Sequence, residues 1–172
     1  MRHARPAGFA LVPLLAALLA ACQPSLNWRE LHSAEARLRG TFPCKPELEL
    51  REAAGMGLWQ CEAGGARYSV AWADVADPTR TGAALVEMSR TVAAKMGAEV
   101  PAALPLTVPG MTPLPEAAAY RLTGPQGDVR LAVFAHGGRA YQAVRMGARD
   151  DATAWATFVG ALRVDGVAQA GS

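Results

Sequence analysis

The sequence predicts an α+β fold, with a central antiparallel sheet of about six to seven strands flanked by two main helices. Two Gly-Gly pairs, at 64–65 and 137–138, each lie between runs of alternating apolar and polar residues, which is the pattern of a β-hairpin. Two other segments, 77–97 and 150–162, carry apolar residues at helical spacing. The roughly 150 residues that follow the N-terminal apolar segment are enough for one domain with its own core.

The N-terminal segment has the pattern of a cleavable export signal. Arg2 and Arg5 precede an apolar run from Phe9 to Ala21, which is thirteen residues long. As a helix this run would span roughly 20 Å, whereas a transmembrane helix needs about 20 apolar residues. A basic start, a short apolar centre and small residues at its end predict a signal peptide over residues 1–21. An uncleaved N-terminal anchor helix is the alternative.

The end of this segment, Leu19-Ala20-Ala21-Cys22, resembles the lipobox of bacterial lipoproteins, in which an aliphatic residue and two small residues precede a cysteine. The resemblance implies cleavage between Ala21 and Cys22 and lipidation of Cys22. Acyl chains on Cys22 would then hold the chain on a membrane, since two or more chains bind far more firmly than one. Residues 22–26 would form a short tether. Gln23, in place of Asp, implies sorting to the outer membrane, with the domain facing the periplasm.

The charge of the mature chain differs from that of the whole sequence. The 172 residues hold 17 Lys and Arg against 15 Asp and Glu. Residues 1–21 contain two of the basic residues, Arg2 and Arg5, and no acidic ones, so 15 basic residues (17 − 2) and 15 acidic residues remain. A neutral chain without a concentrated basic face does not indicate nucleic-acid binding. We therefore expect no nucleic-acid partner.

Two cysteines remain once Cys22 is assigned to the anchor: Cys44 and Cys61. In an oxidising compartment an even pair is typical of a disulfide. Closing a loop of this length would stabilise the fold by roughly 3 kcal/mol. Separate buried thiols are the alternative, and a metal site is disfavoured because neither cysteine lies in a Cys-x-x-Cys motif or beside a histidine. No metal or cofactor is expected.

The first part of the domain is predicted to be mostly extended. Trp28–His32 is expected to form a strand and Ser33–Arg39 a helical turn. Two prolines within 41–46 keep their predecessors out of the helical region. Leu48 and Leu50 alternate with charged residues, which predicts a half-buried strand.

The first Gly-Gly pair determines the register of a hairpin. A two-residue turn at Gly64-Gly65 places Glu62 opposite Arg67 and Cys61 opposite Tyr68. Opposite charges then pair on one face and apolar side chains gather on the other, as a correct register requires. The face expected to look into the core carries Trp59, Cys61, Tyr68, Val70 and Trp72.

A helix is expected after this hairpin. Asp77 is a candidate N-cap, with Pro78 at the first helical position and Gly97 as the stop. The apolar stripe, which we expect to be packing surface rather than a partner groove, consists of Leu85, Met88, Val92 and Met96. Residues 101–115 hold five prolines. Because their main spacing is four residues rather than three, a shaped loop with an edge strand is favoured over a polyproline ligand.

The second Gly-Gly pair, with a preceding strand at 117–122, predicts three further strands. The turn at 137–138 places Leu131 opposite Val144, and this largely apolar face is expected to look into the core. The two strands of this hairpin are predicted at 129–136 and 139–146.

Two arginines are predicted to lie opposite each other on the other face of this hairpin. Arg130 pairs with Arg145, and Tyr141 is on the same face. Directly opposed like charges destabilise a sheet unless something neutralises them. One hypothesis is therefore that Arg130, Tyr141 and Arg145 bind an anionic ligand or partner. The alternative, to which we give more weight, is that Asp128, Glu116 or another nearby carboxylate supplies the counter-charge, or that the register differs.

A last helix is expected to begin at Asp150 or Asp151. Its core-facing stripe consists of Trp155, Phe158, Val159 and Leu162. The chain is expected to fray from Val164, and residues 166–172 to form a flexible tail. The single domain would then span residues 27–165.

Three motifs resemble those of the Mog1/PsbP-like group of small α+β domains. They are Phe42-Pro43-Cys44-Lys45-Pro46, Tyr68-Ser69-Val70-Ala71-Trp72 and Gly138-Arg139-Ala140-Tyr141. The resemblance covers residues 27–165 and implies a central antiparallel sheet flanked by helices, in a domain that acts as an accessory or assembly factor. Cys44 stands where that group often has glycine. The group shares no catalytic residues that would carry over to this chain.

No catalytic residue is predicted. The sequence contains no G-x-S-x-G, H-E-x-x-H, P-loop or dinucleotide-binding motif. His32 and His136 are the only histidines after the signal, and Asp74 and Asp77 are expected to serve in capping. We therefore expect a non-enzymatic module that binds or helps to assemble an envelope protein partner. A carrier of a small ligand or lipid is the main alternative, and a hydrolase is the third.

Overall fold

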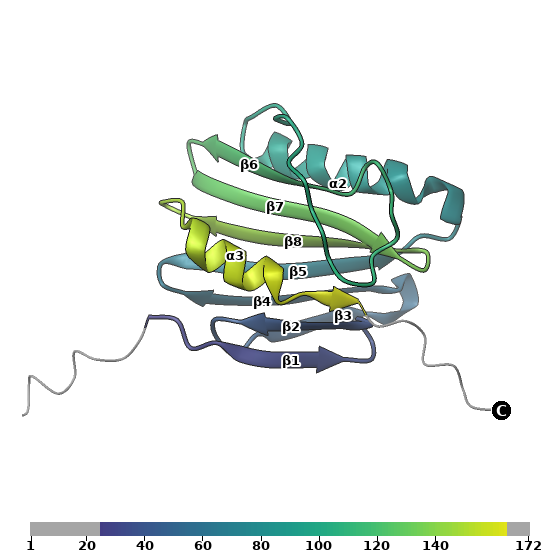
Figure 1. Ribbon diagram of the computed structural model, residues 1–172, viewed down its shortest axis with the longest axis horizontal. Coiled ribbons are helices and arrows are strands. Elements are labelled where there is room, and N and C mark those ends of the chain that lie inside the picture. Colours follow the sequence, from purple (N-terminus) through teal and green to yellow (C-terminus); the bar gives the residue numbers. More distant parts are fainter. Residues whose placement is uncertain (1–24, 165–172) are drawn as a thin grey trace, which may run out of the picture.

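Two antiparallel sheets and two α-helices make up the described part of the chain. The computed structural model describes residues 25–164, so the predicted signal peptide, Cys22 and the tail lie outside the described residues. The large sheet has the strand order β3-β4-β5-β8-β7-β6, and the small one has the order β1-β2-β9 (Figure 1). The fold is therefore α+β, as predicted.

The large sheet is formed by β3 (Glu47–Arg51), β4 (Met56–Ala63), β5 (Ala66–Asp74), β6 (Ala118–Gly124), β7 (Gly127–His136) and β8 (Arg139–Gly147). The small sheet is formed by β1 (Arg29–Ser33), β2 (Leu38–Phe42) and β9 (Arg163–Val164). The helices are α2 (Thr81–Lys95) and α3 (Ala152–Gly160), and two 3₁₀ turns are η2 (Glu52–Ala54) and η3 (Pro78–Arg80).

The start of the domain differs from the prediction. The expected helical turn at 33–39 is wrong, because a tight turn here joins β1 and β2 into a hairpin of the small sheet. The Ala36 N–H donates to Ser33 Oγ at 3.0 Å, and Arg37 takes a positive φ of 50°. These local bonds reverse the chain before a helix can continue. The first strand therefore belongs to a separate sheet, and six strands remain in the large one.

Both Gly-Gly hairpins have the predicted register. Glu62 lies opposite Arg67 and Cys61 opposite Tyr68 in the first hairpin, and Leu131 lies opposite Val144 in the second. All four glycines of the two turns have positive φ, between 55° and 76°. That is the backbone conformation that glycine adopts without a steric penalty, so the turn chemistry explains the register.

Helix α2 covers one face of the large sheet at β7 and β8 (Figure 1). Asp77 accepts a hydrogen bond from the Thr79 N–H at 2.9 Å, so it caps the 3₁₀ turn that leads into the helix. The buried side chains between α2 and the sheet include Leu85, Val92, Met96, Leu122, Val129, Leu131 and Val133. Most of the predicted α2 stripe is therefore core.

The opposite face of the large sheet is covered by α3, the small sheet and the proline-rich loop (Figure 1). Asp151 caps α3 by accepting from the Ala154 N–H at 2.9 Å. Phe158 of α3 is fully buried, with ring centroids 5.1 Å from Phe42 and 5.4 Å from Tyr68. Val108 of the proline-rich loop is buried in the same core, with 1% of its surface exposed. The Leu131 face looks into the core as predicted, and the opposite face of β7 and β8 is covered as well.

Two smaller expectations also need correction. Val164 does not fray: it pairs with Leu38 in β9, and its N–H donates to the Pro109 carbonyl at 3.0 Å. The proline-rich segment is a loop, but the expected edge strand is reduced to one bridge between Leu104 and Ala119. The prolines explain this, because they lack the N–H groups that a longer ladder needs.

Candidate functional site

The anchor residues Ala21 and Cys22 lie outside the described residues, but the start of the domain is close to them. Leu26, the last residue of the predicted tether, packs against the core and lies beside Gly64. The Asn27 N–H donates to the Pro43 carbonyl at 2.7 Å. Among the described residues, Leu26 and Asn27 thus already contact the domain.

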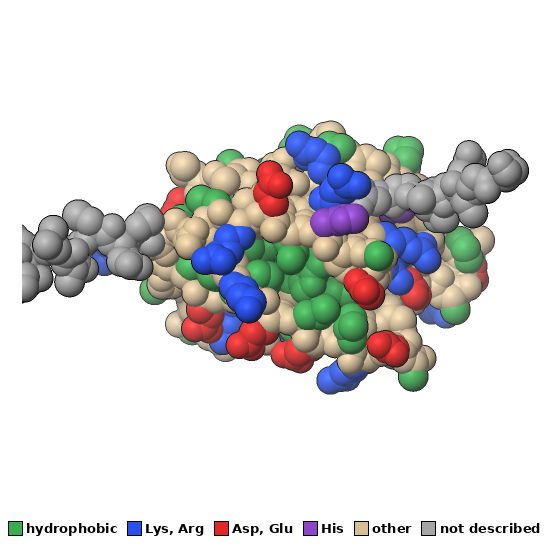
Figure 2. Space-filling view, turned by 90° about the horizontal axis from the view of Figure 1, so that it is seen from below, with side chains coloured by type: hydrophobic (Ala, Val, Ile, Leu, Met, Phe, Trp, Pro, Cys, Tyr) green, Lys and Arg blue, Asp and Glu red, His purple; other side chains and the backbone are tan. Residues whose placement is uncertain are grey.

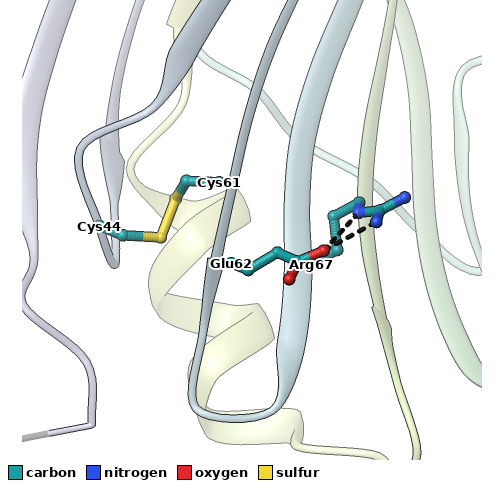
Figure 3. Close-up of a disulfide and its surroundings, with 4 residues drawn as sticks. All are labelled: Cys44, Cys61, Glu62 and Arg67. Atoms are coloured by element: carbon teal, nitrogen blue, oxygen red, sulfur yellow. Dashed lines mark hydrogen bonds and ion pairs between the residues drawn. A yellow bond between two sulfur atoms is a disulfide. The ribbon is translucent and has the colours of Figure 1, made fainter.

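A disulfide joins Cys44, in the segment before β3, to Cys61 on β4 (Figure 3). The S–S distance is 2.01 Å and the Cα atoms are 6.0 Å apart, which confirms the predicted pair. On the neighbouring strand positions, Arg67 donates to Glu62 at 2.7 Å as an exposed ion pair (Figure 3). The covalent bond ties the entrance of β3 to the strand beside it.

One of the opposed arginines, Arg130, is paired with a carboxylate that the sequence reasoning did not name, and Arg121 lies 3.4 Å from the same carboxylate. Arg130 donates to both oxygens of Asp150, at 2.5 and 2.7 Å. These hydrogen bonds hold the pKa of Asp150 below its usual range and raise that of Arg130. Asp150 lies in the short loop between β8 and α3, and its N–H donates to Asp128 of β7 at 3.1 Å, which holds it beside this strand. The favoured alternative, a nearby carboxylate as counter-charge, is thereby confirmed.

The remaining members of the predicted anion site also have protein partners. Arg145 is 4% exposed, and it donates to the Tyr68 hydroxyl at 3.2 Å and to the Arg149 carbonyl at 3.1 Å. Tyr141 is fully buried, and its hydroxyl donates to the Ala36 carbonyl at 2.9 Å. The structure thus brings Arg130 and Arg145 together but directs the Tyr141 hydroxyl elsewhere. Anion binding by these three residues stays a prediction that this geometry does not favour.

A second charged cluster, which the sequence reasoning missed, locks the small sheet onto the large one. Arg139 is 6% exposed and donates to Asp74 at 2.6 and 3.0 Å, and also to the Glu35 carbonyl. Burial opposes the charge of Arg139, but the bonds to Asp74 outweigh it and raise its pKa, while the pKa of Asp74 is lowered. Burial raises the pKa of Tyr141 to about 12. Asp74 therefore serves in an ion pair rather than in the predicted cap.

An apolar groove of about 660 Å³ lies between α2 and the part of the large sheet that α2 leaves bare. Its apolar lining includes Met56, Leu58, Ala71, Ala73, Ala84 and Met88. Its charged and polar rim includes Glu49, Arg51, Glu87, Thr91, Lys95 and Gln142. Met88 packs on the core, as expected for the α2 stripe, and its accessible part also lines this groove.

The edge next to this groove exposes large apolar side chains. Leu48 and Leu50 of β3 are 46% and 39% exposed, and Met56 of β4 is 43% exposed. Figure 2 looks onto the β1–β3 side of the molecule and shows hydrophobic side chains gathered in its middle, with acidic and basic groups around them. The predicted half-burial of β3 was wrong, since all five of its residues are exposed. The alternation of leucine with charged residues predicted the strand, but it did not indicate that the leucines would be exposed.

In residues 25–164, no group of three or more His, Cys, Asp or Glu side chains is placed to hold a metal ion. No helix in this range is long and apolar enough to cross a membrane. Comparison with known proteins adds no assignment: no family model, curated protein or solved structure matches the chain.

Proposed function

We propose that this chain is a bacterial lipoprotein, anchored in the cell envelope through acyl chains on Cys22, whose domain is a non-catalytic module that binds a protein partner. The lipobox pattern at 19–22 supports the anchor, and Gln23 supports the outer membrane, with the domain in the periplasm. The motifs described above support a relationship to the Mog1/PsbP-like domains, which fits an accessory or assembly role. The structural observation that carries the binding role is the apolar groove beside α2.

The groove suits an apolar segment of a protein partner. Its lining is apolar, whereas its rim carries two acidic and two basic side chains, Glu49 and Glu87 against Arg51 and Lys95. Interfaces commonly combine an apolar centre with a polar rim in this way. Met56 in the lining is 43% exposed. This exposure favours an open surface that contacts side chains of a partner over a closed cavity that encloses a ligand.

Site-specific photo-crosslinking in cells producing the full-length protein tests this proposal. A crosslinking amino acid at Glu87, on the groove rim, should capture a reproducible envelope protein. The same amino acid at Arg90, which is exposed on the same helix but does not line the groove, is the matched control and should not capture it. Leu58→Glu, which places a charge in the groove lining, should abolish the product. Equal capture from both helix positions, or capture that survives Leu58→Glu, would contradict the proposed surface.

A small-ligand or lipid carrier is the second candidate, because 660 Å³ lies within the usual range of ligand pockets. Native mass spectrometry of the purified protein distinguishes the two. A bound apolar molecule that disappears in Leu58→Glu, without any partner crosslink, would favour the carrier.

A further inference from the structure

Strand β3 is an exposed edge of the large sheet. All five of its residues are exposed, and among the described strands only β4 pairs with it. It contains no proline and pairs with β4 in continuous register from Glu47 to Arg51. The opposite edge, β6, is partly covered, because Leu104 of the proline-rich loop bridges to it. A regular edge strand with no further strand beside it is a template for pairing with another strand.

The sequence of this strand, Glu-Leu-Glu-Leu-Arg, is complementary to itself when read in the opposite direction. An antiparallel pair of identical strands, centred on Glu49, places Glu47 opposite Arg51 of the second copy. It also places Leu48 opposite Leu50 of the second copy. Symmetry repeats each of these pairs, which gives two ion pairs on one face and two leucine pairs on the other. Opposite charges and apolar pairs directly across strands both stabilise a sheet.

We infer that β3 binds β3 of a second copy of this chain in this antiparallel register, which joins two six-stranded sheets into one continuous sheet. The interface is isologous, as in most homodimers. Leu48 and Leu50, which are among the most exposed large apolar side chains of the described residues, gain partners in it.

Charge and the length of the strand together select this register over its neighbours. A shift of two residues one way places Glu47 opposite Glu49 twice, which is repulsive. A shift the other way pairs Glu49 with Arg51 twice, but it brings Leu48 opposite Glu52, which lies in the 3₁₀ turn η2, so only three residues of each β3 still pair with β3 of the other copy. In the centred register the only like-charge contact is between the two Glu49 side chains. Each of these accepts a hydrogen bond from Gln60 Nε2 at 2.8 Å, so it is already held within its own subunit.

The pairing also brings the two grooves to the same side of the joined sheet. Residues that lie opposite each other across two strands point to the same face. Glu49 and Arg51 line the groove, so the two groove rims meet at the seam. The interface is small, and attachment of both copies to one membrane would raise their effective concentration. That increase rests on the proposed anchor, whereas the pairing itself does not.

Engineered cysteines in the purified full-length protein test the register. In Glu49→Cys the two new thiols lie directly opposite each other, at a Cα separation of about 4.5–5.5 Å that a disulfide spans. Mild oxidation should convert most of this variant into a covalent dimer. Glu47→Cys is the matched control, because its two copies lie about 13 Å apart along the strands and should not crosslink. Equal crosslinking of both variants, or none in Glu49→Cys, would overturn the inference.

A charge exchange provides an independent test by sedimentation of the same protein. Glu47→Arg and Arg51→Glu should each weaken dimerisation about tenfold, because each replaces both ion pairs with like charges. The double variant restores opposite charges and should dimerise like the original. Both side chains are exposed, so the monomer should keep its melting temperature, which is measured alongside. A folded double variant that stays monomeric would show that β3 is not the interface.

Discussion

The two ends of the large sheet are built from similar strands but have opposite surroundings. Near one end, in β7, which is the strand next to the edge strand β6, none of the ten residues is exposed and six of them are buried. At the other end all five residues of β3 are exposed. Both strands are antiparallel and carry regularly spaced apolar side chains. The difference lies in the cover, since α2 packs on one face of β7 and α3 with the proline-rich loop on the other.

The bare end is held by individual bonds where the covered end is held by packing. The Cys44–Cys61 disulfide fastens the entrance of β3 to β4, and Gln60 of β4 donates to Glu49 of β3. The covered end depends on close contacts such as the stacked rings of Phe134 and Tyr141, whose centroids are 5.1 Å apart. The two ends should therefore respond differently to truncation, reduction and acid.

Truncation of the covered end should have the largest effect. Phe134 is fully buried, so Phe134→Ala removes its contacts and should lower the free energy of unfolding by about 4 kcal/mol. Leu48→Ala on the bare strand is the comparison and should change it by less than about 0.5 kcal/mol. Urea denaturation of the two variants measures both values. Similar losses would mean that β3 has a cover in solution that the described residues do not provide.

Loss of the disulfide should have the next largest effect, concentrated at the bare end. The double variant Cys44→Ser with Cys61→Ser should be less stable by about 3 kcal/mol, because the unfolded chain is no longer restricted by the closed loop. Hydrogen exchange should accelerate first at the amides of β3 and β4, with those of β7 changing least. Uniform acceleration over all strands would contradict the view that this bond serves the bare end.

The ion pair between Arg130 and Asp150 should give a smaller, pH-dependent effect at the covered end. Asp150→Asn leaves Arg130 without its counter-charge and should cost about 2 kcal/mol near neutral pH. The pKa of Asp150 is lowered in the fold, so its contribution is present above the pKa of an unfolded carboxyl, about 4, and is lost as the pH falls further.

The difference between the original protein and Asp150→Asn should consequently shrink as the pH falls below about 4. Glu62→Gln is the control, since its ion pair with Arg67 is more than half exposed and should contribute less than about 1 kcal/mol. Thermal melts from pH 7 to pH 2.5 measure both series. If the difference in stability between the original protein and Asp150→Asn did not change with pH, the Asp150 carboxylate would not be the source of the stabilisation.

Several features of this protein could be predicted because they depend on neighbouring residues. The glycine pairs at 64–65 and 137–138 determine both hairpin registers through the backbone they permit. Asp77 and Asp151 cap the turns that follow them for an equally local reason. The disulfide was predictable because two cysteines remained for one pair, and the lipobox pattern of residues 19–22 is itself a short contiguous motif.

Only the tertiary structure decided which faces are covered and which charges meet. Arg139 and Asp74 face each other across β8 and β5, and Asp150, in the loop after β8, reaches Arg130 of β7. The alternation of Leu48 and Leu50 predicted a strand, but nothing along the chain indicated that its position at the edge would leave it bare. The physical reason is that alternation reports a side chain's tendency to be buried. Burial itself depends on which distant segment packs there, and in this protein that segment left the β3 edge and the adjoining groove open.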